Sequence, residues 1–254
     1  FVFNSLAHRT TWLRSDLRIM YQFNSRVRFS ETDANQTMTL YAILNYFQDC
    51  SIFHSEQAGL GITALTEQGY AWIPSSWQTV VDRYPKLGEE ISVSTWAYGF
   101  KGFYGYRNFC IRDTAGKDAA YANTIWTLMD IHTGMPVKIP GYMADLYGLE
   151  DPYPMENAPR KIKSPAEGIS MEPRTVHKFQ IDTNQHMNNA QYVLMAQEYL
   201  PPNSVIHQMR ADYRQAARLN DLIHPVVTVS GSQTTVVLNN KEQDPYAIIE
   251  FIRR

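Results

Sequence analysis

The chain has 254 residues, of which 44% are hydrophobic and 19% charged, with a formal net charge of −2 at pH 7. This composition is typical of a globular protein, and it argues against wholesale disorder and against bulk attraction to nucleic acid or membranes. No apolar run approaches the roughly 18 residues of a membrane helix. The two cysteines, Cys50 and Cys110, lack metal-ligand spacing, so we expect free thiols in a reducing compartment.

The first half of the chain begins with an expected arm over residues 1–16, and its apolar pattern then predicts a strand over Met20–Phe29. Apolar residues recur on one helical face from Leu40 to Gln57, and Gly59 is a natural helix terminator. Segments rich in β-branched and aromatic residues then predict four strands: Tyr70–Asp82, Ile91–Tyr98, Tyr104–Arg112 and Ala119–Met129.

A proline-rich connector over 150–166 separates two predicted units, 17–149 and 167–254. The second unit repeats the order of the first. A strand is predicted over Arg174–Ile181, followed by a polar loop and a helix that Asn188 or Asn189 caps and that ends before Pro201. Four strands follow: Val205–Arg214, Leu222–Val229, Gln233–Asn239 and Ala247–Arg253.

The polar loop of the second unit has a counterpart in the first. The run from Asp33 to Met38 aligns with the run from Asp182 to Met187, and at the same offset Gln48 matches Gln197 and Asp49 matches Glu198. Only the second copy holds a histidine, His186, where the first has Thr37. A strand, a helix and a strand meander, occurring twice, predict two curved antiparallel sheets, each wrapped around a helix.

Three stretches resemble acyl-acyl-carrier-protein (acyl-ACP) thioesterases, the plant plastid enzymes and their bacterial relatives. They are Asp182–Asn189 with Tyr192 and Glu198, Val81–Pro85 with Gly88–Ile91, and Arg107–Phe109 with Trp126–Asp130. The resemblance implies an α+β double hotdog fold. It also implies hydrolysis of fatty acyl-ACP to free fatty acid and holo-carrier protein, without a cofactor or metal.

The partner that this resemblance implies is an acyl carrier protein with a phosphopantetheine-linked acyl chain, and we expect no nucleic-acid or membrane partner. We expect a cytoplasmic location, as in bacteria, rather than the plastid stroma. A monomer with pseudo-twofold symmetry and a homodimer both remain open. In the family the first unit shapes the acyl tunnel, so some of Ile43, Phe47, Trp72 and Trp77 are expected to line it.

By motif match, the family's catalytic Asp, Asn and His fall on Asp182, Asn184 and His186. The family glutamate falls on Ala216, and the cysteine of the plant members falls on Ala217. A cysteine nucleophile is therefore excluded. Either Asp182 serves alone, or another acid such as Glu198 compensates, or the activity is weak.

Thioester hydrolysis suits such a site because the leaving thiol, with a pKa near roughly 8.5, departs more easily than an alkoxide. Asp182 is the expected base or nucleophile, His186 orients water or protonates the thiolate, and Asn184 positions the water or carbonyl. Backbone N–H groups near Asn188 and Asn189 are candidate oxyanion donors, although either residue also suits a helix cap.

Four alternatives remain open at this point. Asp182 also suits a purely structural role as an Asx cap, which is the role expected for Asp33. An acyl-binding protein without turnover and an acyl-coenzyme A thioesterase are the competing functions. A basic patch for the acidic carrier protein is expected at Arg210, Arg214 and Arg218, with ordinary solvated arginines as an equal alternative.

Overall fold

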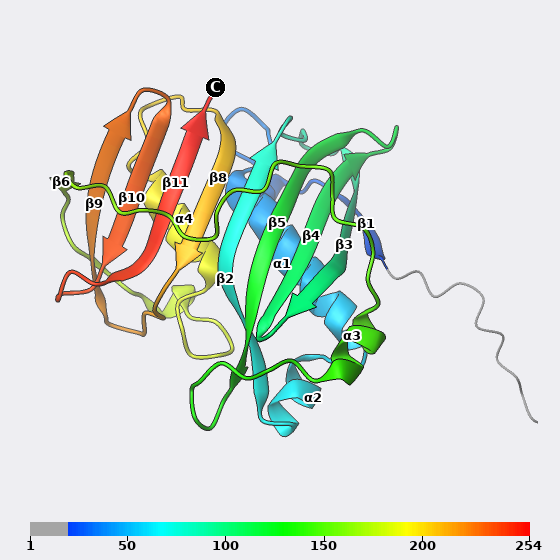
Figure 1. Ribbon diagram of the computed structural model, residues 1–254. Coiled ribbons are helices and arrows are strands. Elements are labelled where there is room, and N and C mark those ends of the chain that lie inside the picture. Colours follow the sequence, from blue (N-terminus) through cyan, green and yellow to red (C-terminus); the bar gives the residue numbers. More distant parts are fainter. Residues whose placement is uncertain (1–19) are drawn as a thin grey trace, which may run out of the picture.

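The computed structural model describes residues 20–254, so the expected N-terminal arm lies outside the described residues. Within that range, one 11-stranded antiparallel sheet curves around two helices (Figure 1). The first half contributes β1 (Tyr21–Arg26), β2 (Tyr70–Val81), β3 (Glu90–Lys101), β4 (Tyr104–Asp113) and β5 (Asp118–Asp130). The second half contributes β6 (Ile169–Ser170), β7 (Arg174–Thr175), β8 (Ile206–Tyr213), β9 (Leu222–Ser230), β10 (Gln233–Asn239) and β11 (Pro245–Arg253).

The order of the strands makes the two halves mirror each other. The sheet runs β1-β3-β4-β5-β2-β8-β11-β10-β9-β6, and β7 also pairs with β9. The halves join where β2 pairs with β8, from Ser76 opposite Asp212 to Val80 opposite Gln208. Each strand of the first half therefore has a counterpart at the same distance from this junction, which confirms the duplication and the double hotdog architecture.

Helix α1 (Leu40–Gln57) has the bounds that its apolar pattern predicts. Thr39 caps it, because its Oγ1 accepts a hydrogen bond from the Ala42 N–H at 3.1 Å. Gly59 adopts a φ of +72°, which ends the helical segment where the sequence predicts. Helix α4 (Asn189–Gln197) is half as long, with 9 residues against 18.

The strand predicted over Arg174–Ile181 is wrong beyond Thr175. The chain turns into a short 3₁₀ helix, η2 (Lys178–Gln180), because the Gln180 side chain accepts a hydrogen bond from the His177 N–H at 2.9 Å. The first unit does the same: β1 ends at Arg26, and η1 (Phe29–Glu31) follows. Two further short helices, α2 (Ile62–Glu67) and α3 (Gly141–Tyr147), were not predicted.

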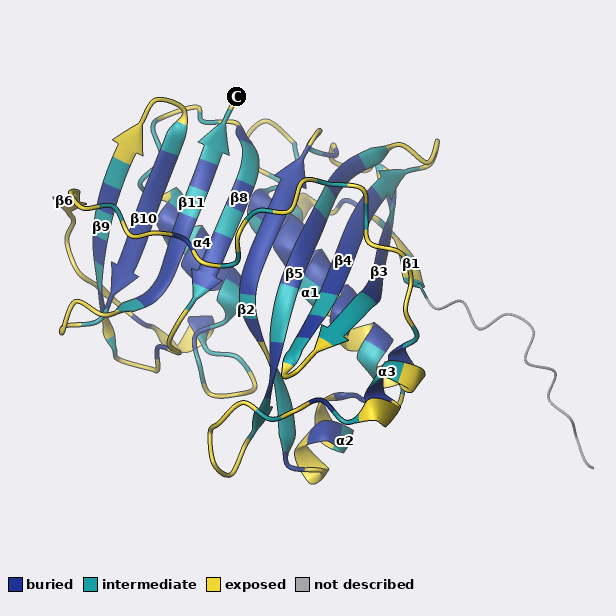
Figure 2. Ribbon diagram, viewed as in Figure 1, coloured by how far each residue is buried: buried dark blue, intermediate teal, exposed yellow. Residues whose placement is uncertain are grey.

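The main hydrophobic core lies between the sheet and the two helices and runs without a break through both halves (Figure 2). Phe47 of α1, Trp77 of β2 and Phe109 of β4 form its aromatic centre, with ring centroids 5.1–6.3 Å apart. Figure 1 shows the connector crossing the opposite face of the sheet. Ile162 in the connector is buried, so this segment also packs against the sheet.

None of the helices within residues 20–254 is both long and apolar enough to span a membrane. In the same range, no cluster of three or more His, Cys, Asp or Glu side chains has a metal-binding arrangement.

Candidate functional site

The polar loop between η2 and α4 is a tight turn built around the Asp182 carboxylate. Its Oδ1 accepts hydrogen bonds from the N–H groups of Asn184 at 2.8 Å and His186 at 3.4 Å. The Asp182 N–H donates to the His186 carbonyl at 2.8 Å. Within residues 20–254 the other carboxylate oxygen, Oδ2, accepts no hydrogen bond. Asp182 therefore closes the loop with one oxygen and leaves the other available.

The loop around Asp33 has the same construction. Asp33 Oδ1 accepts from the N–H groups of Asn35 at 2.9 Å and Thr37 at 3.0 Å, and from Thr37 Oγ1 at 3.1 Å. Gln36 and Gln185 occupy equivalent left-handed positions, with φ values of +59° and +61°. The expected Asx role of Asp33 is confirmed. Asp182 shares this role and also reaches a cavity, which Asp33 does not border.

A cavity of about 500 Å³ lies between α1 and the inner face of the sheet and extends to the Asp182 loop. This volume is in the range of small-molecule sites. The wall is formed by both units. Its polar part includes Arg28, Glu31, Asn45, Gln48, Asp49, Arg107, Asp182, Thr183, Asn184, Asn188 and Asn189, and its apolar part includes Ile52, Leu60, Ile62, Leu65, Trp72 and Trp126.

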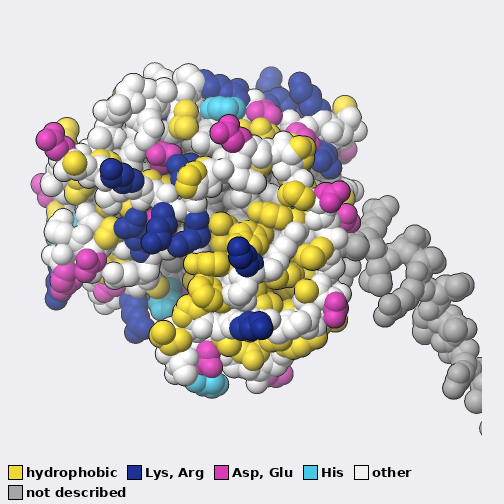
Figure 3. Space-filling model, viewed as in Figure 1, with side chains coloured by type: hydrophobic (Ala, Val, Ile, Leu, Met, Phe, Trp, Pro, Cys, Tyr) yellow, Lys and Arg dark blue, Asp and Glu magenta, His cyan; other side chains and the backbone are white. Residues whose placement is uncertain are grey.

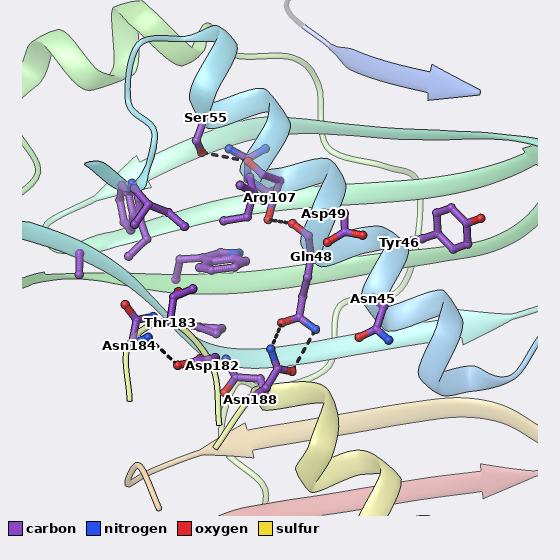
Figure 4. Close-up of a pocket in the computed structure, with 18 of the residues that line it drawn as sticks. Asn45, Tyr46, Gln48, Asp49, Ser55, Arg107, Asp182, Thr183, Asn184 and Asn188 are labelled. Carbon is purple, nitrogen blue, oxygen red and sulfur yellow. Dashed lines mark hydrogen bonds between the residues drawn. The ribbon is translucent and has the colours of Figure 1, made fainter. Parts of the chain in front are cut away.

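The two units meet at the polar end of this cavity. The amides of Gln48 on α1 and Asn188 before α4 exchange two hydrogen bonds, at 3.3 and 3.5 Å (Figure 4). A second contact between the helices is the 2.7 Å hydrogen bond from the Gln191 amide to the Tyr41 hydroxyl. The middle of α1 therefore lies beside the N-terminus of α4, which brings first-unit side chains to the second-unit loop.

The N-terminus of α4 borders the cavity and has one backbone donor without a partner among the described residues. Asn188 caps the helix through its Oδ1, which accepts from the Ala190 N–H at 2.9 Å, so the predicted cap is confirmed. The Asn188 N–H donates to the Gln180 carbonyl at 2.9 Å. Within the described residues the Asn189 N–H has no hydrogen-bond partner. It belongs to the N-terminus of a helix, where the helix dipole stabilises a nearby negative charge.

Asp49 is a carboxylate that the sequence reasoning did not place in the site. It projects from α1 into the same cavity as Asp182, next to Gln48 (Figure 4). Water reaches the Asp49 carboxyl, but the surrounding protein removes part of its hydration and raises its pKa, against the opposing effect of Arg28. The repeat alignment, which matches Asp49 with Glu198, was the sequence signal that could have indicated Asp49 as a site residue.

Three residues of the predicted site do not line the cavity. Among the described residues that form its wall, His186, Glu198 and Ala216 are absent. His186 is half-buried, and within residues 20–254 its ring makes no hydrogen bond. Glu198 is an exposed residue at the C-terminus of α4, and Ala216 is also exposed.

The predicted tunnel residues separate into two groups. Trp72 lines the cavity, whereas Ile43, Phe47 and Trp77 belong to the packed core and do not appear in the cavity wall of the described structure. Cys50 is a buried residue of α1. Burial raises the pKa of its thiol to about 12, so it does not supply a thiolate near neutral pH.

Two of the three arginines expected to form a basic patch, Arg210 and Arg214, contact the connector. Arg210 binds Glu250 at 2.9 Å and the Pro159 carbonyl at 2.7 Å, and Arg214 binds Asp212 at 3.1 Å. These contacts lie on the outer face of the sheet, where Lys and Arg side chains gather around the connector (Figure 3). Arg210 and Arg214 therefore hold the connector in place, Arg214 through a hydrogen bond to the Ile162 carbonyl at 2.9 Å. The basic patch for the carrier protein at Arg210, Arg214 and Arg218 stays a prediction.

Comparisons with solved structures agree with this architecture. An acyl-ACP thioesterase from Bacteroides thetaiotaomicron has a TM-score of 0.84 at 22% identity, with coverage of 93% of this chain and 98% of that chain. The 12:0-ACP thioesterase from Umbellularia californica has a TM-score of 0.82 at 20% identity, with coverage of 93% and 97%. These similarities show the shared double hotdog fold.

Sequence comparisons identify the family. A palmitoyl-acyl carrier protein thioesterase of Gossypium hirsutum is 29% identical over 241 residues, which cover 87% of this chain and 58% of the relative. The chain thus spans little more than half the length of that relative. Family models for the acyl-ACP thioesterase N-terminal and C-terminal domains match residues 18–147 and 163–248. The chain therefore belongs to the acyl-ACP thioesterase family.

Proposed function

We propose that this protein hydrolyses the thioester of fatty acyl-acyl-carrier protein to a free fatty acid and holo-carrier protein. One observation carries the proposal: Asp182 of the second unit and Asp49 of the first border one cavity, beside the free Asn189 N–H. Thioester hydrolysis needs a base for water, a donor for the oxyanion and little help for the leaving thiol. Family membership supports the same reaction.

In the proposed reaction, Asp182 Oδ2 takes a proton from a water molecule that attacks the thioester carbonyl carbon. The Asn189 N–H donates to the oxygen of the tetrahedral intermediate, and the side chain of Asn184 positions the water. The C–S bond then breaks, and the phosphopantetheine thiolate is protonated by the Asp49 carboxyl. Burial raises the pKa of Asp49, which favours its protonated form relative to an ordinary carboxyl group.

His186 has a supporting role in this proposal. Its contacts with Asp182 run through its backbone, at 2.8 and 3.4 Å, rather than through the imidazole ring. Asp49 takes the place that the sequence reasoning gave to a compensating Glu198. The exposed Ala216 lies outside the cavity wall among the described residues, and the proposed reaction does not depend on it.

The test is thiol release from a panel of acyl-ACPs and the matching acyl-coenzyme A thioesters, with wild-type protein and Asp182→Asn. The proposal predicts turnover that favours the carrier-protein substrates and is nearly lost in the variant. Tight binding of acyl-ACP without thiol release would identify a binding protein instead. Equal turnover of the coenzyme A substrates would contradict the assignment of the carrier protein as partner.

A further inference from the structure

The rim of the cavity is marked by the lining residues that water reaches. Arg28 and Ser30 of the first unit and Thr183 and Asn184 of the second line the cavity and are exposed. Arg28 is also close enough to the Asp49 carboxyl to oppose the rise in its pKa. The rim beside the proposed catalytic acids is therefore built from the start of η1 and from the polar loop of the second unit.

An exposed phenylalanine lies at this rim in each unit. Phe29 of η1 lies between the lining residues Arg28 and Ser30, and Phe179 of η2 comes three residues before Asp182. Three residues of chain span at most about 11 Å, so Phe179 is also close to the rim. Phe29 is 82% exposed and Phe179 is 76% exposed, and no other large hydrophobic side chain within residues 20–254 is as exposed as these two.

Polar contacts, and not the phenyl rings, close the two 3₁₀ helices. In η1 the Glu31 carboxylate accepts a hydrogen bond from the Arg28 N–H at 2.8 Å. In η2 the equivalent bond goes to the His177 N–H, at 2.9 Å, and the Phe179 ring only stacks on the exposed His177 ring, with centroids 5.9 Å apart. Single exposed apolar residues are common, but two large rings at one cavity rim indicate an interaction site.

A basic residue directly precedes each of these phenylalanines. The Arg28 side chain is 68% exposed and forms an ion pair with Glu31. Lys178 is exposed, and within residues 20–254 it forms no salt bridge, so its charge is available to a partner. Aromatic residues are enriched in protein interfaces, and exposed cations speed association with an acidic partner. The rim therefore fits a protein with an acidic surface.

The phosphopantetheine arm limits how far from the cavity the carrier protein can lie. About 14 bonds separate the thioester sulfur from the protein oxygen that carries the arm. Because an extended chain advances roughly 1.2 Å per bond, the arm reaches about 17 Å. With its thioester beside Asp182, the carrier protein must therefore contact surface within that radius. Phe179, at most about 11 Å from Asp182 along the chain, is inside it.

We propose that Phe29 and Phe179, with the preceding Arg28 and Lys178, form the docking surface for the acyl carrier protein. The two rings pack against apolar side chains of the carrier protein, and the Lys178 ammonium faces its acidic surface. An anionic membrane fits less well, because lipid-binding segments carry clusters of about 4–8 cations. This inference rests on the proposed function, because it assumes that the acyl chain arrives on a carrier protein.

The experiment compares kcat/KM for acyl-ACP with kcat/KM for the same acyl chain on pantetheine, which has no protein part. In the Phe29→Ser, Phe179→Ser double variant the ratio of the two values should fall roughly tenfold or more, mainly through KM for acyl-ACP. Lys178→Glu should also lower the ratio and weaken the dependence of KM for acyl-ACP on salt. The matched control is Ile169→Ser, which removes a 71% exposed side chain from β6 at the far end of the sheet and should leave the ratio unchanged.

An unchanged ratio in the double variant would overturn the inference. An equal loss for both substrates would also overturn it, since the rings would then support the cavity and not the carrier protein. Cosedimentation with anionic phospholipid vesicles that the double variant loses, at an unchanged ratio, would assign the rim to a lipid surface instead. If the wild-type protein hydrolyses neither substrate, the proposed function fails, and calorimetry with a thioether analogue of acyl-ACP still decides the docking surface. Equal affinity of the wild type and the double variant for this analogue would then refute the inference.

Discussion

The repeat provides an internal control for the role of Asp182. Asp33→Asn and Asp182→Asn remove the same charge from two loops of the same construction, and only the second loop borders the cavity. The stability cost follows from the hydrogen bonds. Asp33 Oδ1 accepts three and Asp182 Oδ1 accepts two, one of which is long at 3.4 Å. An Asn keeps an acceptor oxygen but loses the charge assistance, about 0.5 kcal/mol for each bond in an exposed loop.

We therefore expect the free energy of unfolding to fall by about 1.5 kcal/mol in Asp33→Asn and by about 0.5–1 kcal/mol in Asp182→Asn. The effect on turnover should run the other way. Loss of a catalytic base costs roughly 10²–10⁴ in rate, or about 3–5 kcal/mol, so Asp182→Asn should nearly abolish thiol release. Asp33→Asn should retain at least about half of the wild-type rate, because nothing in the proposed reaction uses it.

The assays are urea unfolding at pH 7 and thiol release at saturating acyl-ACP. Equal losses of turnover in the two variants would refute the catalytic reading and leave Asp182 as an Asx cap. The pH dependence provides a check on Asp33. Partial burial raises the pKa of this carboxyl, but hydrogen bonds from Thr37 and Asn35 outweigh that effect and hold the pKa below its ordinary 3.8. Its stabilisation is complete above that value and is lost as the pH falls through the lower folded-state pKa, so the gap to Asp33→Asn should close in acid.

The remaining predictions concern the residues around Asp182. Asp49→Asn should lower thiol release about tenfold to a hundredfold without lowering the thermal midpoint at pH 7, because burial raises the pKa of Asp49 and so penalises its ionised form in the folded protein. A clearly lower midpoint would contradict this. Asn188→Ala removes a helix cap and both bonds to Gln48, so urea unfolding should show a loss of about 1–2 kcal/mol. His186→Ala should keep turnover within about tenfold, since a ring outside the cavity wall does not transfer the proton. A thousandfold loss of turnover in His186→Ala would contradict this and show that the imidazole ring takes part in the reaction.

The fold followed from local patterns wherever burial and periodicity agreed. Helix α1 begins and ends at the predicted residues, because an apolar face, a Thr cap and a left-handed Gly59 all indicate the same segment. The strand over Arg174–Ile181 was wrong because the Gln180 side chain binds the His177 backbone and favours a turn over an extended chain. A local hydrogen bond between a side chain and the backbone competes with strand formation, and the pattern of apolar residues does not reveal it.

Which residues form the site depends on which helices and loops lie next to each other in the fold. The sequence repeat alone did not reveal this arrangement. Glu198 was named as an acid that could compensate for the missing family glutamate, yet it lies at the C-terminus of α4 and does not line the cavity of the described structure. The pseudo-twofold arrangement instead brings α1 of the first unit against the second-unit loop, which places Asp49 in the cavity. The inward position of Arg107 could be predicted from the sequence, since strand alternation places it on the inner face with Phe109.

The most direct test of the central claim is thiol release from acyl-ACP by the Asp182→Asn, Asp49→Asn double variant beside the wild-type protein. We expect steady turnover by the wild type and no measurable turnover by a double variant that unfolds cooperatively like the wild type. Wild-type turnover by that folded double variant would place the hydrolytic chemistry elsewhere in the molecule and contradict the account.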